Sequence, residues 1–117
     1  MTCEIRAWTM QLQDGAEAAY DAAHADIWPE LVEQMRRDGI CRFHLFRSGL
    51  TVFAVQERKG AFPRGDTVPS VVTEKWWQAM ASLMVTDQKG QPVRTFLDEV
   101  FNLERAAPGT ENKQWQV

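Results

Sequence analysis

The sequence is poor in the side chains that bind metals or form disulfides. It has two cysteines, Cys3 and Cys41, and two histidines, His24 and His44, in 117 residues. The spacing of the cysteines matches no zinc or redox motif, and no Cys/His cluster is present. We therefore expect no metal and no other cofactor, and free thiols in a reducing cytoplasm.

Long apolar runs and dense basic segments are also missing. No stretch approaches the ~18 apolar residues of a transmembrane helix. The N-terminal segment contains Glu4 and Arg6 and is not typical of a signal peptide. The net charge is −3, and the longest basic run is Arg36–Arg37. We therefore expect neither a membrane nor a nucleic acid as a partner.

Motifs for phosphate binding and for serine hydrolysis are absent, which favours chemistry that needs only an acid and a base. The composition, 44% hydrophobic and 25% charged, is that of a soluble globular protein. The length predicts one domain, over residues 1–105, followed by a patternless and flexible C-terminal tail over 106–117. A chain this short leaves little room for a large enclosed pocket, so a deep site could need a second subunit.

Hydrophobic periodicity predicts an alternation of strands and helices. The expected strands cover residues 3–12, 40–48, 50–57 and 95–103. The expected helices cover about 15–26, 29–38 and 70–84, and a surface loop covers 58–69. Asp14 and Glu17 resemble a capping box at the first helix. Pro29 breaks the first helical region and starts a second piece, which Gly39 ends.

The order strand, helix, strand, strand, helix, strand is that of the split βαβ, ferredoxin-like unit. It predicts an α+β fold in which the helices cover one face of an antiparallel sheet. The tight turn at Ser48–Gly49 makes the second and third strands a hairpin. The other face of the sheet also carries apolar residues, which is a liability in water. We therefore expect a homodimer in which two sheets pack face to face.

His24 is the strongest candidate for chemistry. It follows Tyr20 by four residues, a spacing that puts both side chains on one helix face, about 5–6 Å apart at Cβ. Trp28 follows after four more, next to the helix break. Core stripes prefer leucine and isoleucine, so this aromatic face favours a functional site. The alternative is a hydrogen-bonded or surface histidine, which is the more common case. His44, in mid-strand, fits a partly exposed strand residue better than a catalytic one.

Trp76 and Trp77 form the second candidate feature. Neighbours on a helix point about 100° apart, so both cannot face a core squarely. Indole rings stack on the C–H faces of sugars, and their N–H can donate to a hydroxyl. Equally, one ring could pack in the core while the other covers the surface. Asp87 and Glu99 are possible carboxylates, although acidic residues in loops and strands are usually solvated.

Three segments resemble the L-rhamnose mutarotase family. Residues 20–31 match its Y-x-x-x-H-x-x-I-W-P-E-L segment, residues 75–80 its paired-tryptophan motif, and residues 99–103 its closing E-V-F-x-L strand. The resemblance covers about residues 4–104. It implies a dimeric ferredoxin-like α+β barrel that interconverts the α and β anomers of L-rhamnose without a cofactor.

By position, the resemblance implies that His24 is the proton donor and that Tyr20, Trp76 and Trp77 contact the sugar. It departs at Phe43, where the family's second strand often carries a substrate-binding tyrosine. The Phe43 ring can still pack on the sugar, but one hydroxyl contact is lost. L-fucose or another 6-deoxy aldose is therefore an alternative substrate.

The hypothesis for the mechanism is that His24 protonates the ring oxygen as the sugar opens. The general base is not assigned, and the candidates are a water, Asp87 and a group from the partner chain. Two other functions are open. Cofactor-independent oxygenases of the same fold also use aromatic pockets, and a dimeric module could bind a ligand without catalysis.

Overall fold

The computed structural model describes residues 3–63 and 68–105. Its elements in chain order are β1 (Cys3–Gln11), α1 (Glu17–Ala25), α2 (Pro29–Arg37), β2 (Ile40–Ser48), β3 (Thr51–Lys59), α3 (Val71–Met80), the 3-10 helix η1 (Ala81–Leu83), β4 (Thr95–Leu97) and the 3-10 helix η2 (Leu103–Arg105). The tail expected over 106–117 lies outside the described residues.

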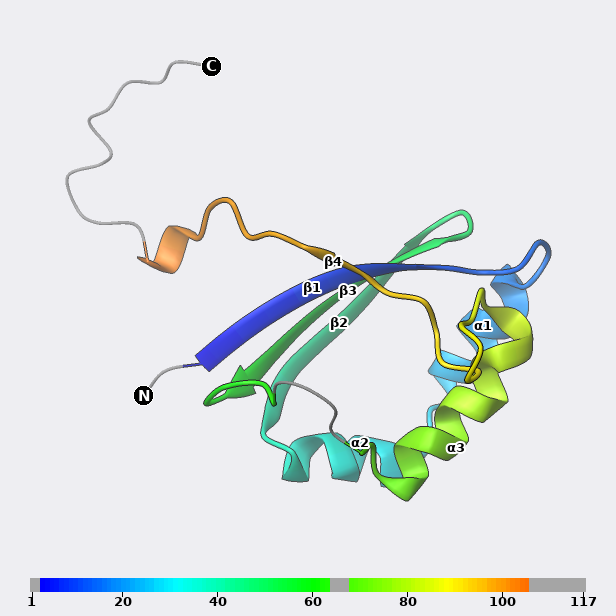
Figure 1. Ribbon diagram of the computed structural model, residues 1–117, viewed down its shortest axis with the longest axis horizontal. Helices are drawn as coiled ribbons and strands as arrows, with labels where there is room; N and C mark the ends of the chain where they lie inside the picture. Colours follow the sequence, from blue (N-terminus) through cyan, green and yellow to red (C-terminus); the bar gives the residue numbers. More distant parts are fainter. Residues whose placement is uncertain (1–2, 64–67, 106–117) are drawn as a thin grey trace, which may run out of the picture.

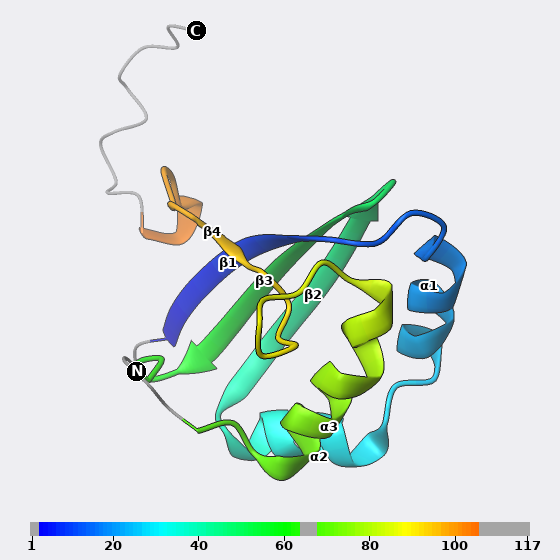
Figure 2. The ribbon, with the colours of Figure 1, turned by 45° about the vertical axis from the view of Figure 1, so that its right-hand side comes forward.

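The four strands form one antiparallel sheet with the order β2-β3-β1-β4. The three α-helices lie together on one side of this sheet, and the other side is left bare (Figures 1 and 2). The α+β class and the predicted order of strands and helices are therefore confirmed.

The core lies between the helices and the covered face of the sheet. In the register of β1 and β3, Trp8 pairs with Ala54 and Met10 with Val52, and all four side chains are buried. These residues pack in one cluster with Tyr20 and other residues of the helices. Alternate side chains of a strand point to opposite faces, so their sequence neighbours form the bare face.

The break between α1 and α2 is where the sequence placed it. Pro29 occupies the first turn of α2, where its missing N–H costs no hydrogen bond. Gly39 follows the helix with φ = 90°, a conformation that favours glycine. The predicted capping box at Asp14 is wrong. Asp14 lies in a turn before the helix, and the N-cap is Ala16, which makes no side-chain cap hydrogen bond.

Two other boundaries differ from the prediction. Helix α3 is capped by Ser70, whose Oγ accepts from the N–H of Thr73, and it ends at Met80 rather than continuing to Met84. Strand β4 is only three residues long, and the chain beyond Leu97 pairs with no described strand. The alternation over 95–103 predicted a strand with a packed face, but nothing in the described chain packs on Val100, which is 93% exposed.

Candidate active site

A pocket lies between the covered face of the sheet and helices α1 and α3. Its volume is about 130 Å³. Pockets that bury drug-sized ligands are larger, ~300–1,000 Å³, so this one suits a single small molecule. The residues that line it are Trp8, Met10, Tyr20, His24, Phe43, Leu45, Trp76, Trp77, Met80, Met84, Gln91, Pro92 and Arg94.

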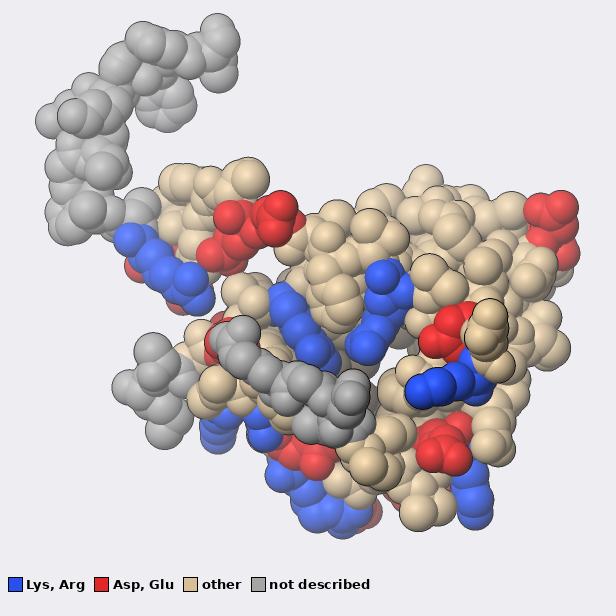
Figure 3. Space-filling view, in the orientation of Figure 1, with Lys and Arg blue, Asp and Glu red and all other residues tan. Residues whose placement is uncertain are grey.

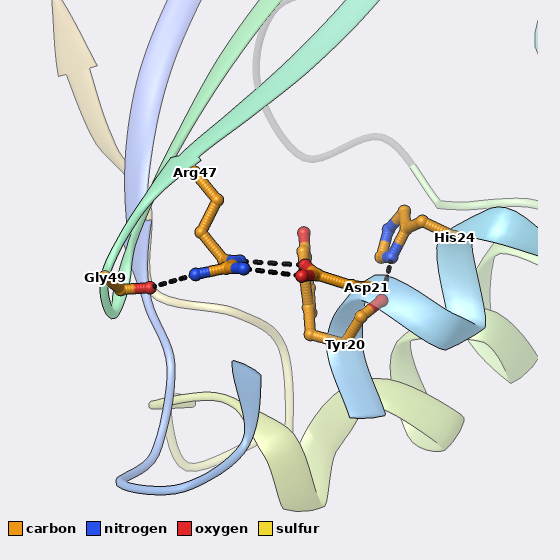
Figure 4. Close-up of polar contacts among 5 residues, drawn as sticks. All are labelled: Tyr20, Asp21, His24, Arg47 and Gly49. Atoms are coloured by element: carbon orange, nitrogen blue, oxygen red, sulfur yellow. Dashed lines mark hydrogen bonds and ion pairs between the residues drawn. The ribbon is translucent and has the colours of Figure 1, made fainter. Parts of the chain in front are cut away.

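Helix α1 fixes the position of the His24 ring and determines which ring nitrogen carries the proton. Nδ1 of His24 lies 2.8 Å from the backbone carbonyl oxygen of Tyr20, one turn earlier (Figure 4). A carbonyl only accepts hydrogen bonds, so Nδ1 carries the proton. In the neutral ring, Nε2 is then an acceptor, and in the charged ring it is a donor. His24 can therefore exchange a proton with a ligand through Nε2.

Aromatic rings hold His24 from two sides. The ring centroids of Tyr20 and His24 are 4.2 Å apart, and Trp76 meets His24 edge-on at 5.2 Å and 88°. Trp28 packs against Trp76 in the same way, at 5.1 Å and 86°. These contacts and the hydrogen bond limit the rotation of the imidazole, and acid/base catalysis depends on a positioned side chain.

An ion pair holds α1 against the sheet. Nε and Nη2 of Arg47, on β2, lie 2.8 Å and 2.5 Å from the two carboxylate oxygens of Asp21, next to Tyr20 in the sequence. Nη1 of Arg47 also donates to the carbonyl of Gly49, in the turn that follows (Figure 4). The hydrogen bond to Arg47 holds the pKa of Asp21 below its ordinary value. The pair thus links the helix that bears Tyr20 and His24 to the β2–β3 hairpin.

Tyr20 is buried and stays neutral in the ordinary pH range. Burial first, and the nearby Asp21 carboxylate second, raise its pKa to about 12. No described residue forms a hydrogen bond with its hydroxyl. Tyr20 therefore presents a hydroxyl that can donate or accept a hydrogen bond at the pocket.

Trp76 and Trp77 both line the pocket, although they point in different directions from α3. Trp76 is 9% exposed and belongs to the core cluster, whereas Trp77 is half-buried at its edge. Phe43 reaches the pocket from β2, with its ring 5.9 Å from that of Trp8. All five residues predicted for the site, Tyr20, His24, Phe43, Trp76 and Trp77, thus surround one pocket.

The other polar candidates from the sequence lie elsewhere. His44 is exposed on the bare face, stacked on Phe46 with centroids 6.0 Å apart. Oδ1 of Asp87 accepts from the N–H groups of Lys89 and Gln91, so it stabilises a turn. Glu99 pairs with Arg105 beyond β4. None of these three candidates is among the residues that line the pocket.

Sequence reasoning missed several residues of the pocket, among them Trp8 and Arg94. The indole Nε1 of Trp8 is buried and has no hydrogen-bond partner. The guanidinium of Arg94 lies 5.5 Å from the centroid of the Trp8 ring. Trp8, Met10 and Leu12 alternate along the strand with residues of the other face, and this pattern is a usable signal. Nothing in the sequence signalled Arg94, which precedes β4 in a loop.

Comparison with known proteins shows the family of the chain. The model of the L-rhamnose mutarotase family matches residues 6–103. The chain belongs to the L-rhamnose mutarotase family. An L-rhamnose mutarotase from Rhizobium johnstonii is 37% identical over 88% of this chain and 99% of its own length. One from Flavobacterium johnsoniae is 34% identical over 84% and 94%.

A solved structure gives the same result for the fold. The crystal structure of the L-rhamnose mutarotase from Formosa agariphila superimposes with a TM-score of 0.75 and 32% identity. The match covers 85% of this chain and 97% of that one. The family resemblance noted in the sequence is thereby confirmed.

The described chain has neither a cluster of metal ligands nor a membrane-spanning helix. Residues 3–63 and 68–105 contain no group of three metal-ligating side chains placed to hold an ion. No helix in these ranges is long and apolar enough to span a bilayer. Cys3 and Cys41 are both free thiols.

The single tyrosine of the chain makes the environment of Tyr20 directly measurable. We expect its ionisation, followed by ultraviolet absorbance, to have a midpoint at about 12 in the folded protein. In denaturant the midpoint should return to ~10, the ordinary tyrosine value. Because the folded pKa is the higher one, its contribution to stability is complete below pH ~10 and is lost as the pH rises towards the folded pKa. A folded-state midpoint near the ordinary value would contradict the buried placement.

Proposed function

We propose that the protein interconverts the α and β anomers of L-rhamnose, or of a closely related 6-deoxy aldose, without a cofactor. The observation that carries the proposal is the orientation of His24. Its Nδ1 is bound to a backbone carbonyl, which leaves Nε2 for a ligand in an aromatic pocket. Membership of the L-rhamnose mutarotase family supports the choice of reaction and of sugar.

Mutarotation needs one proton delivered and one removed. The ring oxygen of the sugar gains a proton as its bond to C1 breaks, and the anomeric hydroxyl loses one as the aldehyde forms. We assign the first step to Nε2 of charged His24, because an imidazole gains and loses protons near neutral pH. A water or a group of a second subunit would take the other proton. Closure on the opposite face of C1 reverses both transfers and returns the proton to the enzyme.

The remaining residues of the pocket would bind and orient the sugar. The Tyr20 hydroxyl, neutral and without a described partner, would pair with a sugar hydroxyl. Trp76 and Trp77 would stack on the C–H face of the ring. Phe43 offers a flat ring without a hydroxyl. These roles are consistent with the place of each side chain in the lining.

The test is exchange spectroscopy by NMR on equilibrated L-rhamnose, with L-fucose as the comparison. Saturation of one anomeric proton reports the α/β exchange rate directly. We expect faster exchange with the protein than in buffer, and faster for L-rhamnose than for L-fucose. Line broadening without faster exchange would indicate a ligand-binding module, and oxygen uptake with phenols in place of exchange would indicate an oxygenase.

We also propose that the active form is a homodimer in which the bare sheet faces pack together. That face exposes apolar side chains, among them Phe46 at 61%, Phe53 at 39% and Leu97 at 48%. Beyond β4, Phe101 and Leu103 are also exposed, at 69% and 77%. Contiguous apolar surface of this kind is characteristic of interfaces. A second copy would cover both surfaces, and it could supply the missing base.

We propose the cytoplasm as the place of action. Cys3 and Cys41 are both free thiols, which a reducing compartment preserves. A sugar released or imported into that compartment would meet the enzyme there.

A further inference from the structure

We propose that Arg47 and Asp21 are positioning residues for the proposed reaction, because their ion pair sets the distance between helix α1 and the sheet across the pocket. This inference rests on the proposed function, since the pocket and the acid/base residue are those of that function. Neither member of the pair is among the residues that line the pocket. The pair would therefore act through the residues that it holds in place, without contact with the sugar.

Helix α1, which carries His24, has little packing to hold it against the rest of the molecule. Five of its nine residues are alanine, and Tyr20 is the only buried one. An alanine side chain removes little apolar surface from water, so it contributes little to the attachment of a helix. Apolar contacts are also non-directional, and they leave a helix some freedom to shift on the surface beneath it. A directional contact would fix where α1 lies.

The ion pair supplies this directional contact. Nε and Nη2 of Arg47 donate to the two carboxylate oxygens of Asp21 over 2.8 Å and 2.5 Å, in the parallel arrangement that guanidinium and carboxylate groups favour. Nη1 of Arg47 donates to the carbonyl of Gly49 over 2.9 Å, so the turn between β2 and β3 orients the guanidinium (Figure 4). Within residues 3–63 and 68–105, no other hydrogen bond or ion pair joins α1 to a strand.

The geometry differs from that of an ordinary surface ion pair. Isolated surface pairs contribute little unless they are bidentate and well ordered. The Arg47 side chain is 28% exposed and makes a bidentate contact with Asp21. By comparison, the pair between Arg37 and Glu33 on α2 is 64% and 70% exposed, with one contact of 3.5 Å. The first pair can therefore hold two elements together, and the second offers a matched control.

The ion pair joins the two walls of the pocket. Phe43, Leu45 and Arg47 alternate along β2, so their side chains lie on the same face of the sheet. Phe43 and Leu45 line the pocket from that face. His24 lines it from α1, three residues after Asp21. The pair therefore fixes how far His24 stands from the sheet wall of the pocket.

This distance matters for proton transfer. A general acid has to lie within hydrogen-bond reach of the atom that it protonates, ~2.6–3.2 Å. A misplacement of ~1 Å, caused by a change far from the chemistry, can cost ~10²-fold in rate. Trp76 and Trp77 belong to α3, so their contacts with the sugar would survive a shift of α1. We therefore expect loss of the ion pair to affect kcat more than KM.

The experiment measures anomer exchange of L-rhamnose by NMR over a range of concentrations, which gives kcat and KM. Asp21→Ala removes the carboxylate but keeps a good helix former, and Arg47→Met removes the guanidinium but keeps an unbranched side chain. We expect each variant to lower kcat about tenfold or more, with KM changed less than about threefold. The double variant should lose no more than either single one, because residues that act as a pair are not additive. Arg47→Lys, which keeps the charge but not the bidentate geometry, should retain part of kcat.

Thermal unfolding confirms that each variant is folded at the assay temperature, and Arg37→Met is the matched control. It removes a guanidinium from the exposed pair on α2 and should leave kcat and KM unchanged. Figure 3 shows charged side chains of both signs in small separate groups on the face that it displays. Because L-rhamnose is uncharged, the loss of one such charge should not by itself affect the reaction.

Two results would overturn the positioning role and leave the proposed function standing. One is a wild-type kcat in folded Asp21→Ala and Arg47→Met, which would show that the pair contributes to stability alone. The other is a double variant in which the two losses add, which would show that the residues do not act as a pair. Absence of catalysed exchange in the wild-type protein would overturn both the positioning role and the proposed function.

Discussion

Replacement of His24 by alanine is expected to remove the catalysed exchange between the anomers of L-rhamnose. Positioned acid/base catalysis contributes typically ~10²–10⁴ in rate, and His24 is the one histidine that lines the pocket. The variant should therefore approach the rate in buffer. Exchange spectroscopy at equal protein concentration measures the loss directly.

Two controls separate chemistry from binding in this experiment. His24→Gln keeps a polar side chain that can hydrogen-bond but does not titrate, so it should be as inactive as alanine. Both variants should still broaden the L-rhamnose lines, because Trp76, Trp77 and Tyr20 remain. An alanine variant with the wild-type exchange rate would show that His24 is not the acid/base residue.

Introduction of acidic side chains on the bare face is expected to convert the proposed dimer into a monomer. Phe46 and Phe53 face each other across β2 and β3, so Phe46→Asp with Phe53→Asp places two like charges together. In a two-fold dimer each substitution occurs twice, so four charges would be buried at one interface. Analytical ultracentrifugation should show the mass of the complex halve.

The matched control for the interface is Val71→Asp. Val71 is 73% exposed at the start of α3, on the other side of the molecule from the bare face. This variant should keep the wild-type mass. A wild-type protein that is monomeric at micromolar concentration, or a double variant that stays dimeric, would contradict the proposed interface.

Much of the fold could be predicted from the sequence because the local chemistry of single residues sets the ends of helices and strands. Pro29 cannot continue α1, and Gly39 adopts a backbone conformation that other residues disfavour. Along β1 and β2, alternate side chains point to opposite faces, so the apolar alternation indicates which residues share the covered face. The alternation failed at β4, where a pattern typical of a packed strand lies on a segment with nothing described against it.

From spacing alone, the site could be predicted only where its residues share one helix, and the family resemblance added Phe43, Trp76 and Trp77. Tyr20 and His24 are a turn apart on α1, so their spacing alone placed them together. Arg94 and Trp8 meet because β4 pairs with the middle of β1. That pairing depends on contacts between residues far apart in the chain, which periodicity does not encode. The sequence pattern therefore does not bring Trp8 and Arg94 together.

Under the proposed mechanism, the hydrogen bond from His24 Nδ1 to the Tyr20 carbonyl would also constrain the movement of the sugar. Because one ring nitrogen is bound to the backbone, a single nitrogen would serve both ring opening and ring closure in that mechanism. Inversion at C1 then requires the aldehyde of the open chain to rotate about the C1–C2 bond while the hydroxyl at C5 stays beside that nitrogen. A pocket that performs this step has to bind one end of the substrate and leave the other end free to rotate. Aromatic ring faces, which form few directional contacts, permit such a rotation.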